Sequence, residues 1–410
     1  MSIEINQENI NAFLHFGWLP RLDIDPPFPE EWVPSEAKND NPSSIEGANI
    51  LREAVSRHVP QGTSVVVPLS GGFDSRAMLA ILHEQGRDIT AVTLGVPGTY
   101  DYEIGRLVAK KMGIRHEAIN INEIPLTTAE LVSYAKKTGD WTNIIETFYS
   151  LLIATKNSAP IVSGFLGDFL AGSYSKYSFP AWKDTQVQFC KDNKVSREIT
   201  LTSPEYDPTT ALFIQPKEFA LTNYEELVYR TRHTCSLRPT AFETDFNYAV
   251  PFRDEEWVSF ILNCPAEFRH GQNFYQKILA ENWPDFFNLP SKNYKGATIN
   301  SSDLKKKLLS QKARVRNKIS RTWPQISHSL LGVDPMLNYT DFNNQIVCNR
   351  NLRDVFIENL SDLEIRNCTP WLDLKTLNKK LNNTKKLSYY EGIMLLTLVN
   401  LEINLKASST

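Results

Sequence analysis

The segment Ser70 to Ser75, with the sequence SGGFDS, combines residue types that suit the binding of a phosphate chain. Gly71 and Gly72 lack a Cβ and can take positive φ, so a phosphate group can approach the backbone closely. The hydroxyls of Ser70 and Ser75 add donors, and free N–H groups at the start of a following helix favour an anion. Asp74 alone would repel phosphate, so its carboxylate indicates a cation between the two, with Mg²⁺ as the natural candidate.

This loop is not a Walker A motif, because the G-x-x-x-x-G-K-[ST] spacing and its lysine are absent. It resembles the SGGxDS loop of the PP-loop ATP pyrophosphatases. In that superfamily the loop holds the β- and γ-phosphates of ATP while the α-phosphorus is attacked, which gives AMP and pyrophosphate. The resemblance implies ATP and Mg²⁺ as cofactors, with adenine held at the strand ends by Leu69, Leu94 and Gly164.

A second segment narrows the family. Residues Ile161 to Tyr174, IVSGFLGDFLAGSY, resemble the SGxGxDE…GGY segment of asparagine synthetases, and Asp168 falls on the second ligand of their magnesium–pyrophosphate. Two positions depart from the pattern, because Phe169 replaces the usual glutamate and Leu166 replaces a glycine. We therefore expect Asp74 and Asp168 to hold the metal. No residue is assigned the role of the missing glutamate.

The resemblance to asparagine synthetases continues downstream. Pro251 to Asp254 is similar to their PFxD segment, and Glu391 to Leu405 is similar to their C-terminal helix. Leu289 to Gly296 lies where the family carries a lysine that neutralises charge on the departing pyrophosphate. Either Lys292 or Lys295 is expected in that catalytic role, and Lys292 better fits the family's distance from the preceding proline.

A ligase that joins a carboxylate to an amine also needs a base. Glu146 and Asp140 precede the fourth predicted strand, in the region where the family places a carboxylate, although both depart from the family spacing. Glu146 is the candidate base, with ordinary surface acids as the alternative. Asp101 and Glu103 follow the second predicted strand, where nucleotide contact and stabilisation of a helix N-terminus are both open interpretations.

Strands and helices alternate around these motifs. Short apolar runs predict strands at 64–69, 89–94, 116–121 and 160–162, and helical periodicity fills the intervals at 74–84, 101–112 and 144–155. This alternation predicts a parallel sheet covered by helices, an α/β PP-loop fold of the adenine nucleotide α-hydrolase kind. We expect an irregular N-terminal arm at 1–42, a PP-loop ATP-binding core at 43–180, and a mostly helical remainder at 181–410 packed on the core. The clearest helices of the remainder are predicted at 225–232, 255–262, 274–282, 303–320 and 389–405.

Composition excludes several classes of protein. The 410 residues carry a net charge of -3, which gives no support for nucleic-acid binding over the whole surface. The apolar run Gly392 to Val399 is too short to span a membrane and the N-terminus lacks a signal-peptide pattern, so we expect a cytoplasmic protein. The five scattered cysteines form no C-x-x-C pair and argue against a disulfide framework or a structural zinc site. The basic stretch Asp303 to Arg321 lacks aromatic residues for stacking on bases, so a solvated helix face is favoured there.

Together these residues predict a carbon–nitrogen ligase. It would adenylate the carboxylate of a small molecule or a peptide and transfer it to ammonia or an amine, as the similar lasso-peptide cyclases and β-lactam synthetases do. Ser2 stands where glutamine-using asparagine synthetases have a nucleophilic cysteine, and the arm is too short for a glutaminase domain, so no glutamine hydrolysis is expected. An RNA-modifying PP-loop enzyme, or a non-catalytic nucleotide-binding subunit, stays as the alternative. A partner protein from the same pathway also stays open.

Overall fold

The computed structural model of the chain describes residues 3–21, 28–156, 158–179, 181–212, 220–233, 237–238, 247–323, 330–337, 340–382 and 387–409. At its centre lies a five-stranded sheet in the order β3-β2-β1-β4-β5. The strands are β1 (Val65–Pro68), β2 (Ile89–Gly95), β3 (Arg115–Asn120), β4 (Ile161–Val162) and β5 (Tyr248–Ala249). Each neighbouring pair is parallel, and Val66 lies opposite both Thr90 of β2 and Ile161 of β4. The predicted parallel α/β sheet is confirmed.

The crossover helices also agree with the predicted alternation. They are α3 (Asp74–Glu84) between β1 and β2, α4 (Tyr100–Lys111) between β2 and β3, and α5 (Thr128–Thr138) with α6 (Ile144–Lys156) between β3 and β4. A helix that follows or precedes a parallel strand runs back along the sheet, so its N-terminus lies at the carboxyl edge. The loop after β1, the first turn of α4, the first turn of α6 and the loop after β4 therefore share one edge of the sheet.

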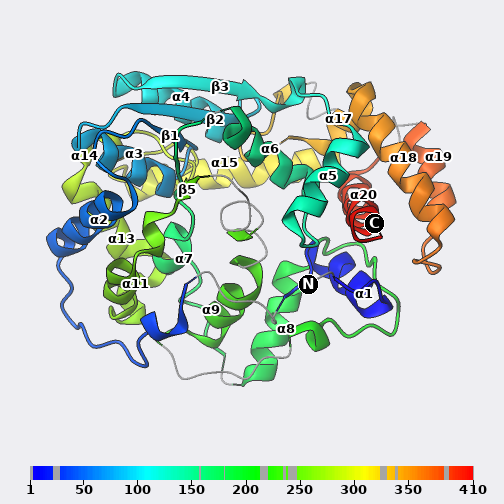
Figure 1. Cartoon of the computed structure of the whole chain (residues 1–410), viewed down its shortest axis with the longest axis horizontal. Coiled ribbons are helices and arrows are strands. Elements are labelled where there is room, and N and C mark those ends of the chain that lie inside the picture. Colours follow the sequence, from blue (N-terminus) through cyan, green and yellow to red (C-terminus); the bar gives the residue numbers. More distant parts are fainter. Residues whose placement is uncertain are drawn as a thin grey trace.

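The part of the chain after residue 180 is mostly helical, as predicted, and Figure 1 shows most of it below the sheet and to its right. All five predicted helical segments are present, the first as α9 continued by a π-helical turn (Val228–His233). The remaining described helices are α2 (Ser44–His58), α7 (Gly167–Leu170), α8 (Trp182–Asn193), α9 (Asn223–Leu227), α11 (Glu255–Leu262), α12 (Ala266–Arg269), α13 (Asn273–Asn282), α14 (Pro284–Phe287), α15 (Asp303–Thr322), α17 (Phe342–Cys348), α18 (Arg350–Arg366), α19 (Leu374–Asn382) and α20 (Tyr389–Ser408). Short 3-10 turns occur at Glu30–Trp32, Ile121–Glu123, Pro208–Leu212, Pro251–Arg253 and His270–Gln272.

The N-terminal arm differs from its prediction as an irregular segment. Helix α1 (Gln7–Phe16) starts after Asn6, whose side chain accepts the N–H of Asn9, and ends at Gly17 in the left-handed conformation. Phe13 on this helix is buried and packs edge-on against Trp141. The many Pro and Trp residues that follow dominate the composition of the arm and hide the short helical period before them.

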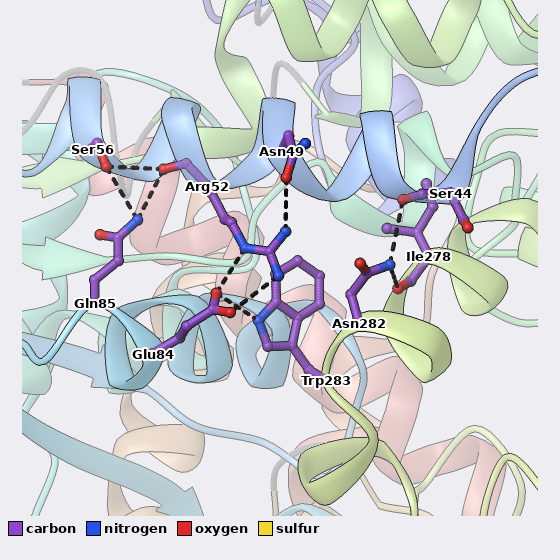
Figure 2. Close-up of polar contacts among 9 residues, drawn as sticks. All are labelled: Ser44, Asn49, Arg52, Ser56, Glu84, Gln85, Ile278, Asn282 and Trp283. Carbon is purple, nitrogen blue, oxygen red and sulfur yellow. Dashed lines mark hydrogen bonds and ion pairs between the residues drawn. The ribbon is translucent and has the colours of Figure 1, made fainter.

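Figure 2 shows how α2, α3 and α13 are fixed to one another. Arg52 of α2 makes a bidentate contact with Glu84 of α3, at 2.8 and 3.1 Å, and lies over the ring of Trp283. The Trp283 indole N–H donates to the same carboxylate at 3.0 Å. The end of α3 is thereby anchored, and the apolar faces of α2, α3 and α13 share one buried core with β1. This packing holds rigid the helix whose first turn forms the candidate site.

Helix α20 contains the apolar run that was too short to span a membrane. It is largely buried, and its second half carries the buried polar residues Asn400, Glu402 and Asn404. Among the described residues, no helix combines the length and apolar character needed to cross a bilayer. The cysteines at 190, 264, 348 and 368 are free, and Cys235 lies outside the described residues.

Candidate active site

The loop Ser70 to Ser75 connects the buried strand β1 to the first turn of α3. Its hydroxyls organise the backbone: Ser75 Oγ accepts the Ser70 N–H and lies 3.1 Å from Ser70 Oγ, and Ser70 Oγ accepts the Gly72 N–H. A Cβ at Gly71 would stand 2.8 Å from the Tyr100 carbonyl oxygen, so the close contact with α4 requires glycine there. The loop is thus a preformed backbone cradle at the positive end of a helix dipole, as the sequence predicted.

The loop after β4 packs directly on this cradle. A Cβ at Gly164 would lie 2.6 Å from the Asp74 carbonyl carbon, and a Cβ at Gly167 would lie 2.7 Å from Asp74 Cγ and Oδ1. Real Cβ contacts do not come so close, so both glycines are needed to bring Asp168 beside Asp74. The two predicted metal-ligand carboxylates, which are 94 positions apart in the sequence, are brought together.

The Asp74 carboxylate is buried beside a second carboxylate, that of Asp168. Burial and the Asp168 carboxylate raise its pKa well above the usual range, while the Tyr275 hydroxyl and the Asp168 backbone N–H act in the opposite direction. Oδ1 of Asp74 is buried without a hydrogen-bond partner in the described part of the chain. Two adjacent carboxylates, one with a free buried oxygen, are the donor set that a divalent cation satisfies.

The departures from the family pattern have a structural explanation. Phe169, in place of the usual glutamate, is fully buried and stacks on Tyr229 with ring centroids 6.1 Å apart. The Tyr229 hydroxyl in turn donates to the Phe28 carbonyl. This position is therefore part of the aromatic core beneath the site. Leu166 has φ 71°, a left-handed conformation that favours glycine, and its buried side chain holds the turn in place.

The segment with both candidate lysines folds over the cradle. Lys292 donates its backbone N–H to the Gly71 carbonyl at 2.8 Å, and its ammonium pairs with Asp101. Asp101 Oδ1 also accepts the Gly71 N–H at 3.0 Å, so this acid links the lysine segment to the cradle. Lys295 lies nearby, and its pKa is lowered by burial and then by the charge of Lys292. Two ammonium groups beside the cradle suit a polyphosphate.

Arg76 holds the lysine segment against the cradle, a role that was not predicted from the sequence. Its fully buried guanidinium donates to the carbonyls of Phe286, Leu289 and Pro290, and to that of Gly71. Arg76, the third residue of α3, thus joins the cradle to the segment that leads into Lys292. Of the two acids with open interpretations, Asp101 contacts the cradle and Lys292, whereas Glu103 accepts the Gly98 N–H at its helix start.

The two candidate bases, Asp140 and Glu146, lie in different electrostatic environments. Asp140 is buried in ion pairs with Arg21 and Arg238, at 3.2 and 3.8 Å, which is a structural arrangement. Glu146 lies in the first turn of α6, at the carboxyl edge of the sheet, and burial raises the pKa of its carboxyl to about 7. A pKa near neutrality is what general-base work requires. Burial also raises the pKa of the neighbouring Tyr149 phenol, with a further contribution from Glu146.

A chain of side-chain amides orients Glu146. Asn143 Nδ2 donates to Glu146 Oε2 at 2.6 Å, while its Oδ1 accepts from Asn400 Nδ2 at 2.9 Å. The Asn400 Oδ1 accepts the Ile145 N–H at 3.0 Å, which leaves only its NH₂ group to face Asn143. Asn400 of α20 therefore fixes the orientation of the Asn143 amide, and the NH₂ group of Asn143 points at the Glu146 carboxylate.

The residues assigned to adenine lie at the expected strand ends. Leu69 is buried, and its backbone bonds to β2 through its N–H to Val92 and through its carbonyl, which accepts from the Thr93 hydroxyl. Leu94 is half-buried on β2. Gly164 contacts the Asp74 main chain, so its lack of a side chain serves loop packing. Adenine binding by these three residues stays a prediction.

Comparison with known proteins agrees with this geometry. Residues 46–238 match the family model described as asparagine synthase. A putative glutamine-hydrolysing asparagine synthetase of Mycobacterium tuberculosis is 26% identical over 159 residues, 37% of this chain and 24% of that protein. A carboxyethyl-arginine beta-lactam-synthase of Streptomyces clavuligerus is 28% identical over 105 residues, 25% of this chain and 20% of that protein. A tRNA-specific 2-thiouridylase of Rickettsia prowazekii is 36% identical over 73 residues, 14% of this chain and 20% of that protein.

These matches cover about a quarter or less of each relative's length. The match to the asparagine synthase family includes both loops, with Asp74 and Asp168, and ends before Lys292 and Lys295. The resemblance to asparagine synthetases, and through the thiouridylase to other PP-loop proteins, is confirmed for this part of the chain.

Proposed function

We propose that this chain is an ATP-dependent ligase that adenylates a substrate carboxylate and joins it to ammonia or an amine. The observation that carries the proposal is the contact between the two loops. Glycines at 164 and 167 bring the carboxylates of Asp74 and Asp168 together beside the backbone cradle. The asparagine synthase match over both loops supports the same reaction class.

In the proposed reaction a substrate carboxylate attacks the α-phosphorus of ATP and pyrophosphate leaves. The cradle at Ser70 to Ser75 would bind the leaving phosphates at the N-terminus of α3 and through its serine hydroxyls, whose positions are fixed by bonds within the loop. Asp74 and Asp168 would hold Mg²⁺, which supplies positive charge against the pyrophosphate oxygens. Among the described residues no three His, Cys, Asp or Glu form a metal cluster, so phosphate oxygens and water would complete the shell of this ion.

Lys292 and Lys295 have complementary tasks in this proposal. Lys292, tied to Asp101 and to the cradle, is held at the phosphates and neutralises charge as it develops. Lys295, whose pKa is lowered by its burial and by Lys292, adds a second donor at the same group. An amine then displaces AMP from the acyl-adenylate, and Glu146 takes the proton that the amine loses.

The test is magnesium-dependent exchange of labelled pyrophosphate into ATP, with a panel of amino acids and small carboxylic acids. We expect exchange with at least one acid, and its loss in Asp74→Asn and Asp168→Asn. Asp184→Asn is the matched control, because Asp184 also lies in a first helical turn but is exposed on α8. Exchange that persists in both site variants contradicts the proposed metal site. Adenylation of tRNA in place of any free acid would assign the chain to the RNA-modifying alternative.

A further inference from the structure

Helix α15 (Asp303–Thr322) exposes large apolar side chains to solvent, whereas an amphipathic helix of a globular protein normally buries them. None of its residues is buried, although it is 20 residues long. Leu304, Leu308 and Val315 are 70%, 57% and 61% exposed. Their spacing of four and seven residues places them on one side of the helix. Figure 1 shows α15 as the long yellow helix of the fold.

The opposite side of α15 is attached to the protein by polar contacts. Lys306 donates to the Ile299 carbonyl at 2.6 Å, and Arg316 donates to the carbonyls of Gly332 and Val333 at 3.2 and 2.7 Å. Lys306 lies on the side of the helix opposite Leu308, and Arg316 lies about 80° around the helix from Leu308. The apolar stripe points into solvent, while Lys306 and Arg316 attach the helix to the rest of the protein.

The exposed stripe has the spacing of a coiled-coil seam. With Leu308 at position a of a heptad, Leu304 takes d and Val315 takes the next a. The positions that flank this seam, e and g, are then occupied mainly by basic residues: Lys305, Lys307, Lys312, Arg314 and Arg321. Among the a and d positions from 304 to 322, Leu304, Leu308 and Val315 are apolar, whereas Gln311, Lys318 and Thr322 are polar. The apolar stripe is therefore short and narrow, whereas a helix lying in a membrane surface needs a wider apolar face.

Charge is strongly divided between this helix and the rest of the chain. Residues 303–322 contain eight Lys or Arg and one Asp, a net charge of +7, so the remaining residues carry -10 in a chain of net charge -3. Two copies of α15 cannot pair with each other, because basic e and g positions would face basic positions. An occupant with acidic flanks is complementary.

We propose that α15 is a docking surface for an amphipathic helix of a partner protein, with apolar residues at its a and d positions and Glu or Asp at e and g. The surface starts close to the candidate site: Ser302, which caps α15, follows Ala297 by five residues, and the Lys306 ammonium lies 4.2 Å from the ring centre of Tyr294. A docked partner would therefore stand beside the segment that carries Lys292. The inference rests on the helix itself and not on the proposed reaction.

The test uses two synthetic peptides of three heptads with leucine at a and d, one with glutamate and one with lysine at e and g. Fluorescence anisotropy of each labelled peptide is measured against the full chain. The five basic residues at e and g of α15 would each pair with a glutamate of the first peptide. Ion pairs of the usual strength predict that this peptide binds at least about tenfold more tightly than the lysine peptide. Lys312→Glu with Arg314→Glu should remove this preference, and Leu308→Gln should weaken the binding.

Lys110→Glu with Lys111→Glu is the control, because it makes the same change of net charge on the exposed end of α4 and should leave binding unchanged. The proposal is overturned if the glutamate peptide binds no better than the lysine peptide, or if both double variants weaken it equally. It is also overturned if the wild-type chain does not bind the peptide but sediments with phosphatidylglycerol vesicles, and Leu308→Gln abolishes this sedimentation. That result would assign the helix to a membrane surface. Concentration-dependent dimerisation lost in Leu308→Gln would assign it to a second copy.

Discussion

Removal of the Asn400 side chain should change the acidity of Glu146, although the two residues do not touch. In Asn400→Ala the amide of Asn143 loses the partner that fixes its orientation at 2.9 Å. Its remaining restraint is the longer bond from the Glu146 N–H, at 3.4 Å. The Asn143 amide can then turn away, and the 2.6 Å bond to Glu146 Oε2 is lost in part or in full.

The size of the effect follows from the bond that is lost. A hydrogen bond to a charged group contributes about 1.5–3 kcal/mol, and one pKa unit corresponds to about 1.4 kcal/mol. Full loss therefore raises the Glu146 pKa by about 1–2 units from its value of about 7. At pH 7 the ionised fraction would fall from about one half to about one tenth or less. The rate of amide formation would fall accordingly and would recover at higher pH.

The assay needs no knowledge of the substrate. The Glu146 carboxyl is titrated by ¹³C NMR in protein labelled at the glutamate side-chain carboxyl, and its signal is assigned by its absence in Glu146→Gln. Asn404→Ala is the matched control, because Asn404 lies one turn along α20 and donates to the Thr142 carbonyl at 2.9 Å, not toward Glu146. An unchanged Glu146 pKa in Asn400→Ala, or an equal shift in Asn404→Ala, would refute the reasoning.

Three further predictions concern the same site. Asp74→Asn and Asp168→Asn should be non-additive in pyrophosphate exchange, because either change already disables the shared metal site, and multiplied effects in the double variant would argue for independent roles. Glu146→Gln should raise the free energy of unfolding by up to about 3 kcal/mol at pH 8, because the buried carboxylate is costly above its pKa of about 7. This gain should vanish toward pH 5, where the native carboxyl is protonated, and urea unfolding at the two pH values decides it. Arg76→Lys should destabilise the fold by about 2–4 kcal/mol in the same assay, because an ammonium cannot serve four separate carbonyls; a change within the error of the method would show that the clamp contributes little.

The sequence was most informative where local chemistry and local structure coincide. The loop at Ser70 to Ser75, its strand and its helix are contiguous, so turn residues and periodicity predict them together. The order of the strands also brings Asp168 to the edge where Asp74 lies. The two-residue strand β5 has no such pattern, because its register comes from pairing with β4.

The missed residues act over long separations in the sequence. Arg76 contacts carbonyls more than 200 positions away, and nothing in its neighbourhood signals them. Asn400 sits within an apolar run of α20, and its side chain is linked to the Glu146 carboxylate through Asn143. A buried Asn in such a run is itself a signal that a polar partner exists, but the sequence does not say where. The sequence left the role of Asp101 open between nucleotide contact and helix stabilisation, and only the fold places Lys292 beside it.

The identity of the nucleotide product tests the central claim most directly. The chain is incubated with Mg²⁺, ATP labelled at the α-phosphate and an acid that supports exchange, together with ammonium or a primary amine, and the nucleotides are separated by chromatography. The proposed ligase forms AMP in an amount equal to the amide, with pyrophosphate as the second product, and Asp74→Asn forms neither. ADP as the main labelled product would contradict attack at the α-phosphorus and, with it, the proposed function.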